Sequence, residues 1–252
     1  MQYGQWTLGI LGMGAVWLLA GCPRGEESAA PFDAGTGEGD PPADLSAAGD
    51  AGLTTTSLVV QNPGFETTFL NPGSYVTNTP PPGWQSYGSI DYSYRSIGSL
   101  NPSTTALYVD PAPEGRNVGV VFLLDRPGDA SYFASSEAGL QQTLTATLLP
   151  STQYTLVVEV GNIATDGSPS HPFNFAGFPN YRIDLLAGGQ ILASDNNTLR
   201  PNEGRFLTST VSFTSGSQHP QMGMALSIRL VNLNNAVGTE VNFDNVRLRQ
   251  TR

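Results

Sequence analysis

From Leu58 onward, apolar and polar residues alternate along the chain with a period of two. The alternation is clearest over 154–160, 181–185 and 226–230. Such a period places one row of side chains in a core and the other outside it, as in β-strands. Gly188-Gly189 lies between two apolar pairs and predicts a hairpin. No stretch has a long helical period, so the pattern predicts an all-β, two-sheet antiparallel β-sandwich (jelly roll) over residues 58–250.

Two predicted strands depart from simple alternation. Residues 117–124 are apolar on both faces, which predicts that a loop covers the strand or that it lines an apolar concavity. In the strand 241–248, Val241 and Phe243 are in one phase and Val246 and Leu248 in the other. That one-residue slip predicts a β-bulge at Asp244-Asn245.

The N-terminus has the features of an export signal. Residues 7–21 are apolar but too short to span a bilayer comfortably, and they end in Leu-Ala-Gly before Cys22. This pattern predicts a lipoprotein signal peptide over 1–21 and lipidation of Cys22; the alternative is a plain signal peptide with an incidental cysteine. Residues 22–57 have almost nothing to bury and predict a disordered tether. We therefore expect an exported protein, lipid-anchored to a bacterial membrane, with the outer membrane (periplasmic or surface side) as its expected location.

Composition and charge limit the partners and the kinds of site that the chain can have. Only 13% of residues are charged, the net charge is −10, and all 11 basic residues are arginines. The chain has no basic stripe, which argues against nucleic acid as a partner, since neutralising phosphates needs clustered cations. Cys22 is the only cysteine, so the fold has no disulfide, thiolate metal cluster or cysteine nucleophile.

Carboxylates near the two ends of the domain suggest a calcium site. Glu66 follows the Asn62–Gly64 turn at the first strand, and Asp244 lies in the last strand. Terminal strands of a sandwich commonly lie close together, so Glu66 and Asp244 could share one Ca²⁺ with oxygens from the Asn62 turn. The alternative is that Glu66 is a surface carboxylate and Asp244 caps the bulge.

Aromatic residues could form a binding surface or a pocket wall. Trp84, Tyr87, Tyr92 and Tyr94 follow a proline-rich run, and Tyr108 precedes the segment 111–115. Aromatic faces can stack on sugar rings or enclose an apolar ligand, but they also serve as ordinary core residues.

Other catalytic arrangements have little support. His171 and His219 are each followed by proline in loop-like segments, and nothing recommends either for a triad or a metal site. No glycine-rich phosphate loop opens a helix. Acid catalysis by a carboxyl group in an apolar pocket remains open. The candidates are Asp110, Glu114, Glu159 and Asp184.

Several strings resemble the hapalindole-type (Stig) cyclases of cyanobacteria, over about residues 62–248. They are NPGFE (62–66), PPGW (81–84), APEGRNVGV (112–120), LQQTLTATLLPSTQYTLVVEVG (140–161), FAGFPNYRIDLL (175–186), GGQILASDNN (188–197), FLTSTVSF (206–213) and VNFDNVRL (241–248). PEGRN and AGFPxYR are specific to this resemblance. NxGFE and FDNV are shared more widely with calcium-binding carbohydrate-binding modules.

The resemblance implies a jelly roll with structural calcium, and a pocket at a subunit interface, hence a homodimer. It also implies acid-promoted rearrangement and cyclisation of an isonitrile indole terpenoid, in which an Asp donates the proton and a Tyr and a Phe line the pocket. Tyr108 fits that Tyr, and Leu140 stands at the position of that Phe. The family's VDFDN has Asn242 at its first Asp here, whereas Asp244 keeps the second. If the first Asp is the acid, Asn242 cannot replace it, because a carboxamide holds no comparably acidic proton. If the second Asp is the acid, Asp244 keeps the catalytic role, with Tyr108 beside it.

Three functions remain open from the sequence. The first is a calcium-stabilised domain that binds a small apolar or amphipathic ligand, with or without Stig-type cyclisation, using Tyr108, Leu140, Asn242 and Trp84. The second is a carbohydrate-binding surface module without catalysis, in which Trp84 and Tyr87 form a glycan platform. The third is a spacer on the cell surface. The doubly apolar strand 117–124 favours the first, and in each case the lipid anchor is the only expected contact with the membrane.

Overall fold

The computed structural model describes residues 52–103, 106–124, 137–165 and 174–252. The predicted signal peptide, Cys22, almost all of the tether and His171 lie outside these residues. In the part that is described, no helix is long and apolar enough to cross a membrane.

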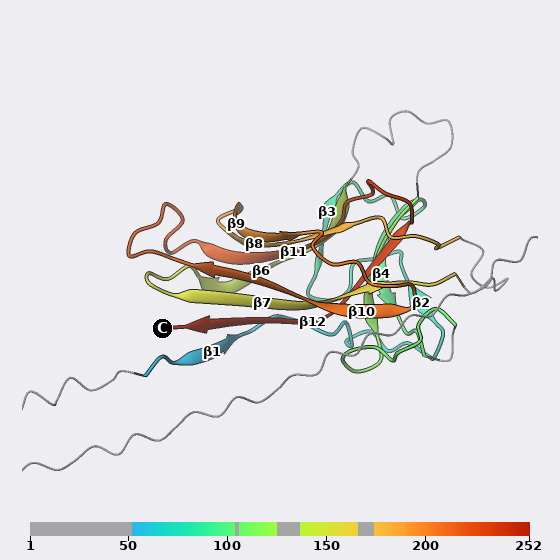
Figure 1. The fold of residues 1–252 in the computed structure, drawn as a ribbon, viewed down its shortest axis with the longest axis horizontal. Helices are drawn as coiled ribbons and strands as arrows, with labels where there is room; N and C mark the ends of the chain where they lie inside the picture. The colour runs from blue at the N-terminus through green and yellow to red at the C-terminus, as the bar shows by residue number, and fades with distance from the viewer. Residues whose placement is uncertain (1–51, 104–105, 125–136, 166–173) are drawn as a thin grey trace, which may run out of the picture. The chain divides into compact units, whose positions relative to one another are not determined.

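The described chain forms two antiparallel sheets, which confirms the predicted all-β sandwich (Figure 1). The larger sheet has the order β10-β7-β12-β5-β4-β2, with β1 also paired to β12, and the smaller has the order β3-β6-β11-β8-β9. The strands are β1 Thr55–Leu58, β2 Tyr75–Val76, β3 Gln85–Gly88, β4 Arg95–Leu100, β5 Val118–Leu123, β6 Ala138–Thr147, β7 Gln153–Asn162, β8 Tyr181–Ala187, β9 Gln190–Asn196, β10 Arg205–Thr214, β11 Ala225–Asn232 and β12 Glu240–Thr251. β1 begins at Thr55, so the last residues of the predicted tether are already part of the sheet.

The alternating segments form the strands that the period of two predicts. β7, β8 and β11 contain the three clearest segments, and Gly188-Gly189 joins β8 to β9. Both glycines have positive φ, which a tight hairpin turn requires and which glycine adopts without steric cost. The inward rows of the two sheets form one central core.

The central core holds the largest buried aromatic side chains. Phe65 is fully buried and stacks on Trp84, with ring centroids 5.4 Å apart. The Phe65 ring lies directly over Gly119, where an added Cβ would come within 2.6 Å of Phe65 Cζ. This close approach packs the segment after β1 against β5, and burying a Phe side chain contributes about 1.5–3 kcal/mol.

The predicted bulge in β12 is present. The pairing of β12 with β7 shifts register between Asp244 and Arg247, and Asn245 has φ +52°. Val241 and Phe243 point into the central core before the bulge, and Val246 and Leu248 do so after it. The bulge therefore reverses which residues of β12 face the core.

Candidate functional site

β12 presents three buried polar residues on the face of its sheet that lies away from the central core. Glu240, Asn242 and Asp244 alternate with the core residues Val241 and Phe243, and their exposed fractions are 6%, 0% and 0%. Buried polar groups are retained where neighbours satisfy them or where chemistry needs them. This face of β12 therefore carries the candidate site.

A second apolar cluster covers this outer face of the larger sheet. Its strand members are the outward row of β5 and Leu100 at the end of β4, and loop residues before β5 and after β7 close over them. The buried members are Leu100, Leu107, Tyr108, Val118, Val120, Phe122, Ile163 and Phe175. The doubly apolar β5 is thus covered by loop residues, one of the two predicted alternatives.

Tyr108 is the polar centre of this second cluster. Its hydroxyl donates a 2.6 Å hydrogen bond to Asn242 Oδ1, and its ring stacks on Phe206 with centroids 4.5 Å apart. Backbone hydrogen bonds hold the residues on either side, since Leu107 O accepts from Ala164 and Val109 N donates to Gly204. Tyr108 is therefore anchored over β7, β10 and β12.

Gly161 gives Tyr108 the room to reach Asn242. Gly161 lies in β7 between Asn242 of β12 and Phe206 of β10. A Cβ at this position would lie 2.4 Å from Phe206 Cε1 and 2.7 Å from the Tyr108 hydroxyl oxygen. A side chain at residue 161 would therefore displace both rings.

Glu240 adds a third residue to the hydrogen-bonded series that begins with Tyr108 and Asn242. Glu240 Oε1 accepts a 2.9 Å hydrogen bond from Asn242 Nδ2, so Asn242 links the carboxyl group of Glu240 to the phenol of Tyr108. Burial raises the pKa of Glu240 to about 7, against an opposing effect of the Asn242 hydrogen bond. Burial, followed by the charge of Glu240, raises the pKa of Tyr108 well above 10. Near neutral pH the phenol therefore keeps its proton, and the carboxyl group exists in both forms.

A separate acidic cluster surrounds Asp244. Its Oδ2 accepts from the backbone N–H of Glu114 at 2.8 Å and its Oδ1 from Asn245 N at 2.7 Å. Burial raises the pKa of Asp244 to about 8; the two backbone donors oppose this rise, and the charges of Glu114 and Glu66 add to it. The two predicted carboxylates, Glu66 and Asp244, therefore lie close enough to act on each other, with Glu114 as a third.

The oxygens of this cluster suit a hard divalent cation. Glu66 Oε1 accepts from the backbone of Arg116 and Asn117, and Val246 N donates to Pro63 O, so the two ends of the domain meet here. A buried carboxylate with like-charged neighbours is the chemistry that calcium relieves. Within the described residues, no three His, Cys, Asp or Glu side chains already form a metal-ligand group. The cluster therefore supplies oxygen ligands for a cation, but its side chains do not form a complete coordination shell.

Asn62, the other predicted metal ligand, is used in its own turn. Its Nδ2 donates to Pro82 O, its Oδ1 accepts from Thr67 N, and its backbone oxygen accepts from Trp84 Nε1. These contacts fix the loop that carries Glu66.

Two residues predicted to bind ligand lie in the central core. Trp84 is 4% exposed and Leu140 is fully buried there, whereas Tyr108 and Asn242 lie on the other face of the larger sheet. Leu140 therefore lies away from Tyr108. The aromatic ring that stacks on Tyr108 is that of Phe206. The sequence reasoning missed Phe206 because its contact with Tyr108 depends on β10 pairing with β7 beside Gly161.

The predicted glycan platform does not form from Trp84 and Tyr87, because Trp84 is buried. The guanidinium carbon of Arg229 lies 4.5 Å from the centroid of the Tyr87 ring, and the Tyr87 hydroxyl donates to Glu137 at 2.6 Å. That ring is already occupied by protein contacts.

The four acids proposed from sequence lie elsewhere. Asp110 pairs with Arg205, Asp184 with Arg182, and Glu159 accepts from Thr208, while Glu114 belongs to the acidic cluster. The acid next to the second cluster is Glu240, which the sequence reasoning missed. The available signal was its position two residues before Asn242, which puts both on one face of a strand.

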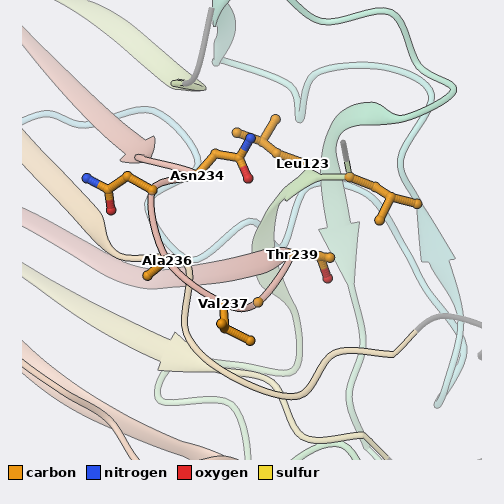
Figure 2. Close-up of a pocket in the computed structure, with 8 residues that line it drawn as sticks. Leu123, Asn234, Ala236, Val237 and Thr239 are labelled. Carbon is orange, nitrogen blue, oxygen red and sulfur yellow. The ribbon is translucent and has the colours of Figure 1, made fainter. Parts of the chain in front are cut away.

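A pocket adjoins the second cluster at the start of β12. Figure 2 shows it lined by the loop residues Asn234 to Thr239 and by Leu123 and Leu124 at the end of β5. Leu124 also packs against the second cluster, and Glu240 directly follows Thr239. The pocket therefore lies beside the end of β12 that carries Glu240.

Comparisons with known proteins agree with this fold. The family model described as HpiC1 cyclase matches residues 56–249. The Stig cyclase FisC from Fischerella sp. TAU, in complex with (3Z)-3-(1-methyl-2-pyrrolidinylidene)-3H-indole, is 37% identical with a TM-score of 0.69, covering 78% of this chain and 98% of that one. A cyclase from Fischerella sp. TAU in complex with 4-(1H-indol-3-yl)butan-2-one is 39% identical with a TM-score of 0.69, covering 77% and 97%. No curated protein matches the chain. The chain therefore belongs to the HpiC1-like family, the Stig cyclases.

Proposed function

We propose that this chain binds a small, indole-bearing apolar ligand at the second cluster and promotes its acid-catalysed cyclisation. The observation that carries the proposal is the buried hydrogen bond from Tyr108 to Asn242, with Phe206 stacked on the Tyr108 ring. Apolar walls with a few convergent polar groups are typical of small-molecule sites. The indole compounds bound to two family members support an indole-bearing ligand.

The pocket at Leu124 gives such a ligand a position at the edge of the second cluster. Its lining combines apolar Leu123, Leu124 and Val237 with the amides of Asn234 and Asn235. An indole ring presents an apolar face and one N–H donor, which an Asn side-chain oxygen can accept.

We also propose that Ca²⁺ stabilises the domain at Glu66, Glu114 and Asp244, as the family resemblance implies. Arg116 lies 3.6 Å from Glu66, and the ion would add positive charge beside Glu114 and Asp244 and would join the two ends of the domain. Asn242, the partner of Tyr108, lies on the same strand as Asp244, so a fixed Asp244 also fixes the register of Asn242.

The remaining part of the proposal concerns location. Lipidation of Cys22 would anchor the domain to the membrane, and residues after it would act as a tether. The ligand would then be met outside the cytoplasm.

Titration of the lipid-free domain with 4-(1H-indol-3-yl)butan-2-one, in the presence of calcium, tests ligand binding by calorimetry. We expect saturable binding that weakens in Tyr108→Phe, because the ring is then no longer held to Asn242 by their buried hydrogen bond. Leu140→Val, a small change in the central core, is the matched control and should bind as the parent does. Absence of saturable binding by the parent protein would overturn the proposal.

A further inference from the structure

The hydrogen-bonded chain of the site has a carboxamide at its centre. Asn242 touches the Tyr108 hydroxyl, but its side chain has no acidic proton to give. Tyr108 is a poor donor as well, because burial and the charge of Glu240 oppose loss of its proton. An acid-promoted reaction at this site therefore needs another group.

Glu240 is the carboxyl group placed to supply it. It is 6% exposed, its Oε1 lies 2.9 Å from Asn242 Nδ2, and it stands opposite Phe122 in the β5–β12 pair. Among the ion pairs between described residues, none involves Glu240. A carboxyl group in apolar surroundings without a cation retains its proton and can donate it.

The position of Glu240 also connects the two parts of the site. Thr239, the residue before it, lines the pocket in Figure 2, and Asn242, two residues after it, contacts Tyr108. Along β12, Glu240 therefore lies between a residue that lines the pocket and the residue that contacts Tyr108.

We propose that Glu240 is the catalytic acid of this site, with Asn242 as the positioning residue that holds its carboxyl group and Tyr108 together. This inference rests on the proposed function. The carboxyl O–H bond breaks and a C–H bond forms at an unsaturated carbon of the substrate, leaving a carbocation and a carboxylate. The π electrons of the indole form the new C–C bond, and the cyclised cation returns a proton to the carboxylate. The sequence is redox-neutral and restores the acid.

The surroundings of Glu240 in the described residues leave Tyr108 as the titratable partner. The cluster presents Val120 and Phe122 from β5 and Phe175 from the segment after β7, none of which carries charge. On β12 itself, the next acid on this face is Asp244, beyond Asn242. Burial also raises the pKa of Asp244 to about 8, so comparison with Glu240→Gln is what assigns the pH profile of the reaction to Glu240.

The test is turnover of an isonitrile-bearing indole terpenoid by the lipid-free protein with calcium, from pH 5 to 9, beside binding of 4-(1H-indol-3-yl)butan-2-one. We expect kcat to be level at low pH and to fall above about pH 7 as Glu240 ionises. Glu240→Gln keeps an oxygen that can accept from Asn242, so it should retain affinity for the probe and lose about 10²- to 10⁴-fold in kcat. Adding Asn242→Asp to Glu240→Gln returns a carboxyl group beside Tyr108 and should restore part of the rate.

Glu203→Gln is the matched control, because Glu203 is exposed on the loop before β10. A Glu240→Gln protein that binds the probe and turns over at the parent rate would overturn the role of Glu240 and leave the proposed function standing. Probe binding without turnover by the parent would overturn the catalytic step alone, and absence of probe binding by the parent would overturn both. If Glu240→Gln does not fold, the parent decides: a kcat that is level across pH 5 to 9 contradicts the inference.

Discussion

The buried carboxyl group of Glu240 should make the stability of the domain depend on pH in a way that one substitution removes. Its pKa is raised from 4.5 to about 7, with burial as the main cause. Below pH 4.5 the group is protonated in both the folded and the unfolded chain. Between 4.5 and 7 the folded chain keeps a proton that the unfolded chain releases, so a rise in pH favours unfolding. Above 7 the full destabilisation is present.

The magnitude follows from the same shift. At about 1.4 kcal/mol for each pH unit, a buried ionised Glu240 lowers the free energy of unfolding by about 3 kcal/mol. Glu240→Gln is neutral at every pH and preserves an acceptor for Asn242 Nδ2. We therefore expect the parent and Glu240→Gln to be similar in stability at pH 4, and the variant to be more stable by about 3 kcal/mol at pH 9.

The assay is urea unfolding of both proteins at several pH values with calcium constant. Titration of other groups, including Asp244, occurs in both proteins and cancels in the difference between them. Glu203→Gln, the exposed counterpart, should show no such divergence. Parallel stability curves for the parent and Glu240→Gln would show that the fold does not hold a proton on this carboxyl group, and the reasoning would fail.

Four further predictions follow from other contacts. Chelation of calcium should lower the melting temperature by about 5–10 °C, the shift expected for loss of an ion present at 100 times its Kd. This decrease should grow as pH rises through 8, where Asp244 ionises, and should disappear in Asp244→Asn. An unchanged melting temperature after chelation counts against the calcium site. Gly161→Ala should displace Tyr108 and its stacked phenylalanine, destabilise the domain by about 1–3 kcal/mol in urea unfolding and weaken binding of the indole probe; full affinity would show that the ring pair is not needed. Leu140→Ala should cost about 2–5 kcal/mol but leave calorimetric affinity for the probe intact, and a selective loss of affinity would restore Leu140 to the ligand site. Cys22→Ser should move the exported protein from the membrane fraction to the soluble fraction on immunoblots, and retention in the membrane would contradict lipidation.

The strands of this fold were predictable because their signal is local. A period of two over 154–160 or 226–230 needs no knowledge of the partner strand, and the two glycines at 188–189 define their own hairpin. The bulge at Asp244-Asn245 was also visible, because one extra residue within a strand shifts the phase of every apolar position that follows it.

The site was less predictable because it depends on contacts between distant segments. Tyr108 and Asn242 were both singled out, but only the fold shows that they share a hydrogen bond. Trp84 was expected to face ligand because an aromatic residue after a proline run suits a surface as well as a core. Its burial against Phe65 depends on Gly119 of β5, which no local pattern indicates.

The register of β12 positions both the hydrogen-bonded residues around Asn242 and the carboxylate cluster around Asp244. Val241 and Phe243 are fully buried in the central core, so packing fixes which residues of the strand face outward. A slip of one residue would send Glu240, Asn242 and Asp244 into that core and expose two large apolar side chains, which is strongly unfavourable. The bulge at Asn245 then ends the outward polar row at Asp244, next to Glu66. Packing of the core thus sets both the acid–amide–phenol chain at one end of this row and the carboxylate cluster at the other, and for that reason calcium removal should alter ligand binding as well as stability.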